Sequence, residues 1–123
     1  CLPPCHLLAQ FNVRNNNRLD CIVYMRSVDL CLGLPSDIVL YATLLILLAN
    51  ECGYKPGSLM FMMGDTHVYE NHIEEFRRQA RRSVANLPMW KLEEGTKLFE
   101  FYPRNIFLDN YAHHDQINFI FNV

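Results

Sequence analysis

The chain has 123 residues and a mass of 14.4 kDa, which is the size of one domain and excludes a multidomain assembly. Half of its residues are hydrophobic and 20% are charged, which predicts a packed core and excludes a disordered or collagen-like chain. Its formal net charge of −2 provides no basic field for holding a long nucleic acid. We therefore expect a globular domain that does not bind long nucleic acids.

The five cysteines predict a reducing, cytoplasmic location. They are odd in number, form no CxxC pair and lie in apolar stretches. The longest apolar run, residues 38–49, is shorter than the roughly twenty residues that span a bilayer, so we expect a core helix and no membrane anchor. No charged and apolar leader opens the chain, so we expect no signal peptide. Because the sequence starts abruptly at Cys1, we expect a fragment or a processed product.

Residues 6–14 and 19–26 mix apolar and polar side chains around an Asn-Asn-Asn-Arg segment, which predicts a β-hairpin. A helix is predicted over residues 36–52, with Pro35 and Ser36 at its start, Asp37 in its first turn and Gly53 at its end. Its apolar residues surround the whole circumference, so we expect it to be central and buried.

In the second half of the chain the sequence patterns that predict turns, strands and helices are weaker. Residues 54–57 predict a turn, residues 59–63 a short apolar strand, and residues 71–85 an exposed helix with i,i+4 ion pairs that ends before Pro88. Three further strand candidates follow, at residues 97–102, 106–108 and 117–123. Strands with one buried and one exposed helix indicate the α+β class.

Cys5 and His6 form the first candidate for chemistry. The thiol follows a stiff diproline segment and precedes a strand, so the backbone could aim it, and nearby cations would favour the thiolate. The alternative is that Cys5, like Cys21, Cys31 and Cys52, is a small hydrophobic residue of the core.

Two further clusters carry binding groups. Arg26 and Ser27 suit a phosphate and precede Asp29, although these residues alone favour a surface ion pair. His67 and Tyr69 fall on one face of an extended segment, where they could hold a sugar hydroxyl or merely form a satisfied polar cluster. No HxxxH or CxxC spacing supports a metal site, so we expect none.

Taken together and in order, the segments LPPCH, YMRSVD, LGLPSDI and GDTHVYENH resemble the C-terminal half of a thymidylate synthase or of the related deoxycytidylate (dCMP) hydroxymethylase. The ending YAHHDQINFIFNV resembles the tail of the same family, so that the resemblance covers residues 1–123 as one half of a single catalytic domain. It implies a mixed sheet with one buried central helix and one exposed helix, and a homodimer for the complete protein.

The resemblance also implies residue roles. Cys5 would add to C6 of a deoxypyrimidine monophosphate, with His6 beside it shaping the water network, and C5 would then attack the methylene of methylenetetrahydrofolate, the cosubstrate. Arg26 would also favour the thiolate, and the tail would close over the ligands. The remaining roles are phosphate binding by Arg26 and Ser27, folate contact by Asp29 and Gly33, and ribose binding by His67 and Tyr69.

Asp37 occupies the position at which thymidylate synthases carry an asparagine that reads the base edge. A protonated Asp37 could donate to N3 of cytosine and accept from its amino group, and an ionised one would suit N3-protonated cytosine. Mispaired buried polar groups cost about 1–3 kcal/mol, so either state favours cytosine. The alternative is a first-turn acid favoured by the helix dipole.

These observations modestly favour 5-hydroxymethylation of dCMP. Asp37 and the Met25 of YMRS resemble the hydroxymethylases, whereas LGLP and the tail are closer to the synthases. One alternative is thymidylate synthase proper, which methylates dUMP to dTMP and releases dihydrofolate. Another is an inactive fragment or structural remnant, since half of a site alone is expected to be inactive.

Overall fold

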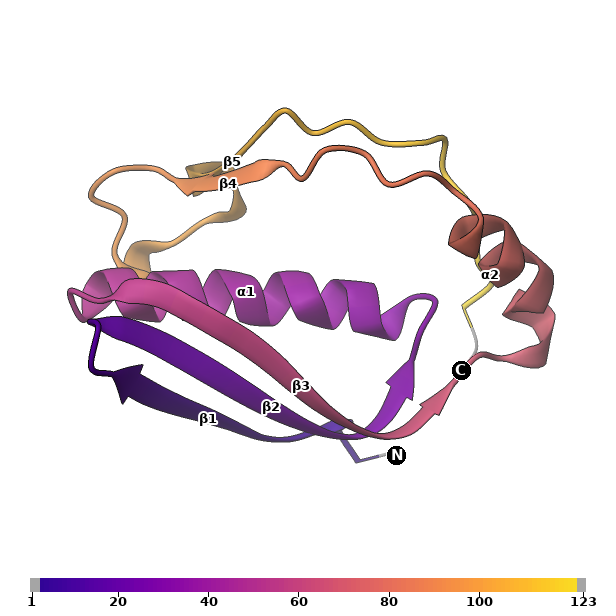
Figure 1. Ribbon diagram of the computed structural model, residues 1–123, viewed down its shortest axis with the longest axis horizontal. Coiled ribbons are helices and arrows are strands. Elements are labelled where there is room, and N and C mark those ends of the chain that lie inside the picture. Colours follow the sequence, from indigo (N-terminus) through magenta and orange to yellow (C-terminus); the bar gives the residue numbers. More distant parts are fainter. Residues whose placement is uncertain (1–2, 122–123) are drawn as a thin grey trace. The chain divides into compact units, whose positions relative to one another are not determined.

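The computed structural model describes residues 3–121, and the chain divides into two compact units, residues 1–70 and 71–123. The first unit contains a three-stranded sheet and a long helix, and the second contains a short helix and a two-stranded sheet (Figure 1). The predicted α+β class is confirmed.

β1 (His6–Arg14) and β2 (Arg18–Asp29) form the predicted antiparallel hairpin. Asn17 adopts the left-handed conformation in the turn, with a φ of 61°, because asparagine tolerates this region better than most residues. β2 is longer than predicted and includes Ser27 and Asp29. The binding cluster expected just after the hairpin therefore lies in the central strand of the sheet.

β3 (Lys55–His67) lies parallel to β2 on the side opposite β1, which gives the strand order β1-β2-β3. The strand predicted at residues 59–63 is its middle. A parallel pair needs a long crossover, and the helix between β2 and β3 supplies it. The ends of β2 and β3 consequently lie side by side, with Asp29 in register with His67.

The turn predicted over residues 54–57 is wrong from Lys55 onward, where β3 has already begun. Two contacts hold this segment against β2. The Arg18 guanidinium donates to the Pro56 carbonyl oxygen at 2.8 Å, and the Ser58 N–H donates to the Asp20 carboxylate at 2.7 Å. Neighbouring-strand contacts thus override the local turn preference of proline and glycine.

α1 (Gly33–Glu51) begins three residues earlier than its predicted start. The Asp29 carboxylate accepts hydrogen bonds from the N–H groups of Leu32 and Gly33, each at 3.2 Å, so the acceptor for the helix start comes from the preceding strand. Asp37 accordingly lies beyond the first turn. The predicted stop is confirmed, because Gly53 follows the helix with a φ of +71°.

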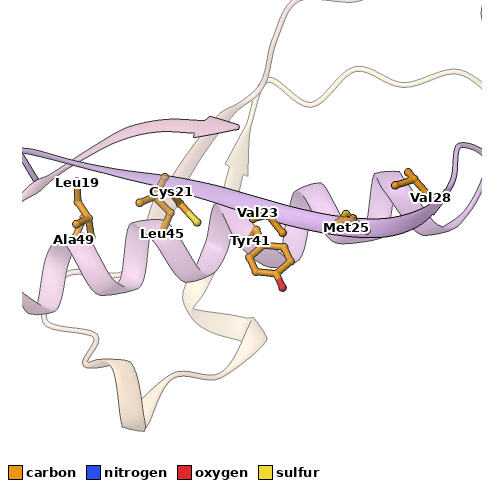
Figure 2. Packing of buried hydrophobic residues seen from close by; sticks show 8 residues of the cluster. All are labelled: Leu19, Cys21, Val23, Met25, Val28, Tyr41, Leu45 and Ala49. Atoms are coloured by element: carbon orange, nitrogen blue, oxygen red, sulfur yellow. The ribbon is translucent and has the colours of Figure 1, made fainter. Parts of the chain in front are cut away.

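The expectation that α1 is buried all round is wrong within this chain. One face packs on the sheet, while Ile38, Val39 and Leu40 remain exposed. The core between α1 and the sheet is drawn in Figure 2 and consists of Leu19, Cys21, Val23, Met25, Val28, Tyr41, Leu45 and Ala49. Alternate residues of β2 face the helix, as the period of a strand requires.

α1 is also long and apolar enough to cross a membrane by length and composition alone, with a mean hydropathy of 1.5 over the span and 22% of it buried. A helix that packs on a sheet in a soluble core meets the same test, so this finding is weak evidence for a membrane span.

The 3₁₀ turn Glu70–His72 spans the boundary between the two units, and α2 (Ile73–Ala80) follows it directly. α2 ends well before Pro88, contrary to the prediction of a helix over residues 71–85. The segment after it is tied to the tail: Arg82 donates to the Asp115 carbonyl oxygen at 2.5 Å, and the His114 Nε2 lies 2.9 Å from the Ser83 carbonyl oxygen. The Arg77–Glu74 ion pair, at 2.7 Å, has i,i+3 spacing instead of i,i+4.

β4 (Met89–Leu92) and β5 (Ile106–Asp109) form an antiparallel pair. β5 confirms one predicted strand, whereas β4 was not predicted. The strand predicted at residues 97–102 is wrong, since the 3₁₀ turn Leu98–Glu100 lies there and a second such turn, Pro103–Asn105, follows it. Residues 117–121 are not a strand either, and residues 122–123 lie outside the described part.

Candidate active site

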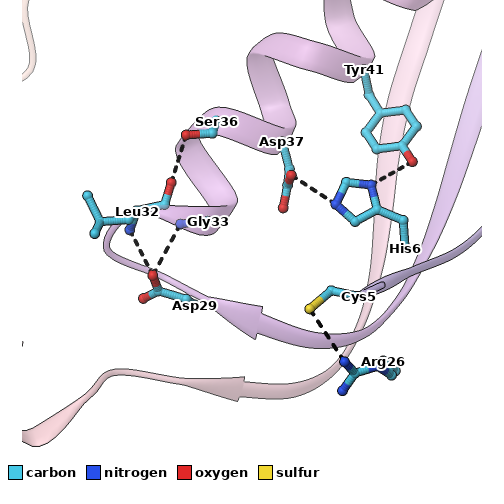
Figure 3. A network of polar contacts seen from close by, with 9 residues as sticks. All are labelled: Cys5, His6, Arg26, Asp29, Leu32, Gly33, Ser36, Asp37 and Tyr41. Carbon is cyan, nitrogen blue, oxygen red and sulfur yellow. Dashed lines mark hydrogen bonds and ion pairs between the residues drawn. The ribbon is translucent and has the colours of Figure 1, made fainter. Parts of the chain in front are cut away.

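Cys5 lies between the diproline segment and β1, and its sulfur faces the Arg26 side chain of β2 (Figure 3). The Arg26 backbone N–H donates to the Cys5 carbonyl oxygen at 2.9 Å. Its guanidinium donates to the carbonyl oxygens of Pro3 at 2.5 Å and Pro4 at 3.2 Å, and Nη2 lies 3.8 Å from the Cys5 Sγ. The predicted association of the thiol with a cation is therefore present in the structure.

This arrangement suits a nucleophilic thiol. A guanidinium is permanently charged and donates several hydrogen bonds in a fixed plane, so it can hold the backbone and still face a sulfur anion. Burial, by contrast, raises the pKa of the Cys21 and Cys31 thiols, and the Asp29 carboxylate adds to the rise at Cys31. These two cysteines match the alternative interpretation of inert core residues.

His6 faces α1 on the other side of Cys5 and lies between two side chains of that helix (Figure 3). Its Nε2 is 3.0 Å from Asp37 Oδ1, and its Nδ1 is 2.8 Å from the Tyr41 hydroxyl oxygen. Asp37, His6 and Tyr41 thus form one connected polar chain beside the thiol. Sequence reasoning identified the first two and missed Tyr41, although its i,i+4 spacing from Asp37 placed both on one helix face.

Asp29 and Gly33 are brought together where β2 ends and α1 begins. The Asp29 carboxylate accepts from the backbone N–H groups of Cys31, Leu32 and Gly33 at 3.0–3.2 Å. A Cβ added at Gly33 would lie 3.4 Å from the Asp29 Cβ, so the backbone approaches this side chain closely. The carboxylate of Asp29 therefore has a structural role at the helix start, and its predicted contact with folate stays a prediction.

His67 and Tyr69 come together at the end of β3, with their ring centroids 5.1 Å apart and their planes at 84°. The two rings are in contact, although β3 ends at His67 and Tyr69 follows it outside the strand, so the common face does not come from strand alternation. His67 is in register with Asp29 of β2, and its carbonyl oxygen accepts from the Leu30 N–H at 3.1 Å. Ser27 lies two residues earlier in β2, opposite Asp65. These side chains form a second group at the carboxyl ends of the two parallel strands.

Met25 and the C-terminal tail differ from the other candidates. Met25 is 3% exposed and belongs to the core cluster, so the methionine of YMRS serves packing in this chain.

The tail, from Tyr111 onward, belongs to the second unit, and its closure over ligands stays a prediction.

Comparison with known proteins gives one consistent result. The family model described as thymidylate synthase matches residues 1–123. The chain is 41% identical over 116 residues to a protein named thymidylate synthase from Mycoplasma pneumoniae, covering 94% of this chain and 40% of that protein. It is 40% identical over 116 residues to a bifunctional dihydrofolate reductase-thymidylate synthase from Paramecium tetraurelia, covering 94% and 25% respectively. The chain thus spans less than half the length of either relative.

Proposed function

Since this chain belongs to the thymidylate synthase family, we propose that the complete protein transfers a one-carbon group from methylenetetrahydrofolate to C5 of a deoxypyrimidine monophosphate. The observation that carries the proposal is the placement of Cys5 against the Arg26 guanidinium, with Nη2 3.8 Å from Sγ. The names of both relatives support reductive methylation of dUMP to dTMP as the reaction. They give no support to the hydroxymethylation of dCMP that the sequence favoured.

In the proposed reaction the Cys5 thiolate forms a bond to C6 of the pyrimidine, and the electron pair of the C5–C6 double bond makes C5 nucleophilic. C5 then bonds to the methylene carbon as one of the two C–N bonds joining that carbon to the folate breaks. C5 later loses its proton to solvent, and the second C–N bond breaks to release the folate. The S–C6 bond breaks, the double bond returns and the thiolate is released. Methylenetetrahydrofolate supplies the carbon and, in methylation, also the hydride, so that dihydrofolate leaves.

The residues of this chain would position the thiol and bind the substrate and the folate. Arg26 keeps the thiol in position and offers charge to the thiolate or to the substrate phosphate. His6 and Asp37 form the polar wall beside the thiol, where the base edge would lie. Ser27, His67 and Tyr69 would bind the phosphate and ribose, with Asp29 and Gly33 near the folate, as the family resemblance implies.

Hydroxymethylation of dCMP remains the second candidate because one observation favours it. Asp37 presents a carboxylate, and its Oδ1 already meets the His6 Nε2 at 3.0 Å. A carboxyl group can match the amino group of cytosine, whereas an amide matches uracil. In this reaction water, instead of hydride, would complete the transfer.

We also propose that the complete protein is a homodimer formed through the sheet face opposite α1. Leu8, Tyr24 and Met62 are in register across β1, β2 and β3. Leu8 and Met62 are about half exposed, at 54% and 49%. Apolar side chains gathered on one sheet face are typical of a protein interface. Sedimentation of the complete protein as a monomer at micromolar concentration would contradict this arrangement.

A cytoplasmic location fits the thiol chemistry of the proposed reaction. The described cysteines, which are Cys5, Cys21, Cys31 and Cys52, are all free. Reducing compartments keep thiols in this state, and the proposed nucleophile requires it.

Product analysis tests the function directly. The complete protein is incubated with methylenetetrahydrofolate and either dUMP or dCMP, and the products are identified by mass spectrometry while absorbance follows dihydrofolate. We expect dTMP and dihydrofolate from dUMP, and loss of turnover in Cys5→Ser but not in Cys52→Ser, whose site is exposed at the end of α1. Hydroxymethyl-dCMP without dihydrofolate would support the second candidate, and no product from either nucleotide would contradict both.

A further inference from the structure

The His6 imidazole is clamped by two side chains that lie one helical turn apart on α1. Asp37 approaches Nε2 at 3.0 Å, and the Tyr41 hydroxyl approaches Nδ1 at 2.8 Å. Side chains at i and i+4 lie on the same face of a helix, so one rigid element supplies both partners of the ring. Neither the sequence motifs nor the family resemblance assigned a role to Tyr41.

The Tyr41 side chain is fixed by burial and by ring packing. It is 9% exposed, and its ring meets the Phe61 ring edge to face at 6.0 Å and the His6 ring at 5.3 Å. A phenol fixed by packing in this way offers its hydroxyl at one place with little loss of conformational entropy. The hydroxyl therefore defines where the imidazole ring must sit.

The hydrogens of this chain can be placed by elimination. Burial raises the pKa of Tyr41, and the negative charge of Asp37 raises it further, so the phenol keeps its proton at neutral pH and can donate it. A neutral imidazole has one N–H and one acceptor nitrogen. The phenol hydroxyl could donate or accept, but an ionised carboxylate oxygen only accepts, so in the neutral ring the hydrogen lies on Nε2, facing Asp37, and Nδ1 accepts from Tyr41.

We propose that Tyr41 is a positioning residue whose hydroxyl holds the His6 ring in the orientation, and with it the tautomer, in which Nε2–H faces the Asp37 carboxylate. The inference rests on the proposed function, because it concerns groups that would face the pyrimidine. Oδ1 of Asp37 is occupied by His6 in this arrangement, which leaves Oδ2 for the base. Tyr41 would contribute to base recognition without contacting the substrate.

The test uses the complete protein with ¹⁵N-labelled histidine. The ring nitrogens of His6, assigned from their loss in His6→Asn, report which nitrogen carries hydrogen. We expect the Nε2–H form in the unaltered protein and a mixture of both neutral forms in Tyr41→Phe, which keeps the ring and removes the hydroxyl. Tyr54→Phe is the matched control, since Tyr54 also packs against the core cluster, and it should leave the His6 signals unchanged.

Steady-state kinetics supply the second readout. Loss of one positioning hydrogen bond should lower kcat for the preferred nucleotide roughly three- to tenfold in Tyr41→Phe, with KM changed less. An Nδ1–H form of His6 in the unaltered protein would overturn the proposal even if Tyr41→Phe does not fold. His6 signals that stay unchanged in a folded Tyr41→Phe protein would overturn it as well.

The two hypotheses fail separately. If the unaltered protein turns over neither nucleotide, the proposed function is wrong, yet the NMR signals still report whether Tyr41 sets the tautomer. If turnover is observed but the tautomer does not depend on Tyr41, only the positioning role is wrong.

Discussion

Arg26 contacts Cys5 through both its backbone and its side chain. Its backbone N–H donates to the Cys5 carbonyl oxygen at 2.9 Å, and its guanidinium Nη2 lies 3.8 Å from the Cys5 Sγ. The same guanidinium also donates to the carbonyl oxygens of Pro3 and Pro4. One side chain therefore sets both the path of the backbone before the thiol and the charge beside it.

Arg26→Lys should separate these two tasks. The ammonium keeps the charge but cannot reach the sulfur and two carbonyl oxygens in the fixed plane of a guanidinium. A misplacement of the nucleophile by about 1 Å costs on the order of a hundredfold in rate, so we expect kcat to fall by about that factor. Arg18→Lys is the control, because Arg18 donates to the Pro56 carbonyl oxygen at 2.8 Å on the same strand. An Arg26→Lys enzyme of normal activity would contradict the positioning role.

Asp37→Asn should change the preference between nucleotides. The amide presents both a donor and an acceptor to the base, which matches uracil, and mispaired groups cost about 1–3 kcal/mol. We expect the ratio of kcat/KM for dUMP to that for dCMP to rise roughly ten- to hundredfold. Glu51→Gln, at the far end of α1, makes the same chemical change away from the thiol and should leave the ratio unaltered. A constant ratio in both variants would exclude Asp37 as the base reader.

Asp20 should make stability depend on acid pH. Hydrogen bonding from the Ser58 N–H, opposed by burial and assisted by Arg14, holds the pKa of Asp20 below its usual value of 3.8. A lowered pKa in the folded state stabilises the protein fully above the unfolded value, and this contribution disappears as the pH falls through the folded value. In urea unfolding, the stability difference between the unaltered protein and Asp20→Asn should shrink below about pH 4. Glu94→Gln, in an exposed turn, should show no such convergence.

Gly64→Ala should disturb Arg26 from the neighbouring strand. A Cβ at this position would lie 2.6 Å from the Arg26 carbonyl oxygen and 3.2 Å from the Met25 carbonyl oxygen, so the backbone of β2 must shift. We expect destabilisation by about 1–3 kcal/mol and slower alkylation of Cys5 by iodoacetamide. Ser58→Ala, on the same strand, should change neither. Normal Cys5 reactivity in a destabilised Gly64→Ala protein would show that the shift does not reach the thiol.

The part of the fold that depends on local pattern was predictable from the sequence. The hairpin has its asparagine turn and the helix has its glycine stop, and both are confirmed. The start of α1 was not predictable from capping rules, because its acceptor is Asp29 of the preceding strand. The early start of β3 likewise depends on pairing with β2, which no short window of sequence contains.

The candidate site likewise contains residues that the sequence predicted and one that it did not. Cys5, His6, Arg26 and Asp37 were predicted and are brought together by described contacts. Tyr41 was missed because a tyrosine within an apolar helix is indistinguishable in the sequence from a core residue until the partner of its hydroxyl is known. The placement of His6 against Asp37 and Tyr41 depends on packing between a strand and a helix.

The parallel pairing of β2 with β3 has a consequence for the nascent chain. Cys5 and Arg26 meet through a hairpin formed within residues 5–29, whereas β3 can join β2 only after the whole of α1 has been synthesised. Contacts between residues close in the sequence have the smaller loop-closure cost and form sooner. The Cys5 thiol would therefore meet the Arg26 guanidinium before β3 joins the sheet, so the contact at the thiol does not depend on the parallel half of this sheet.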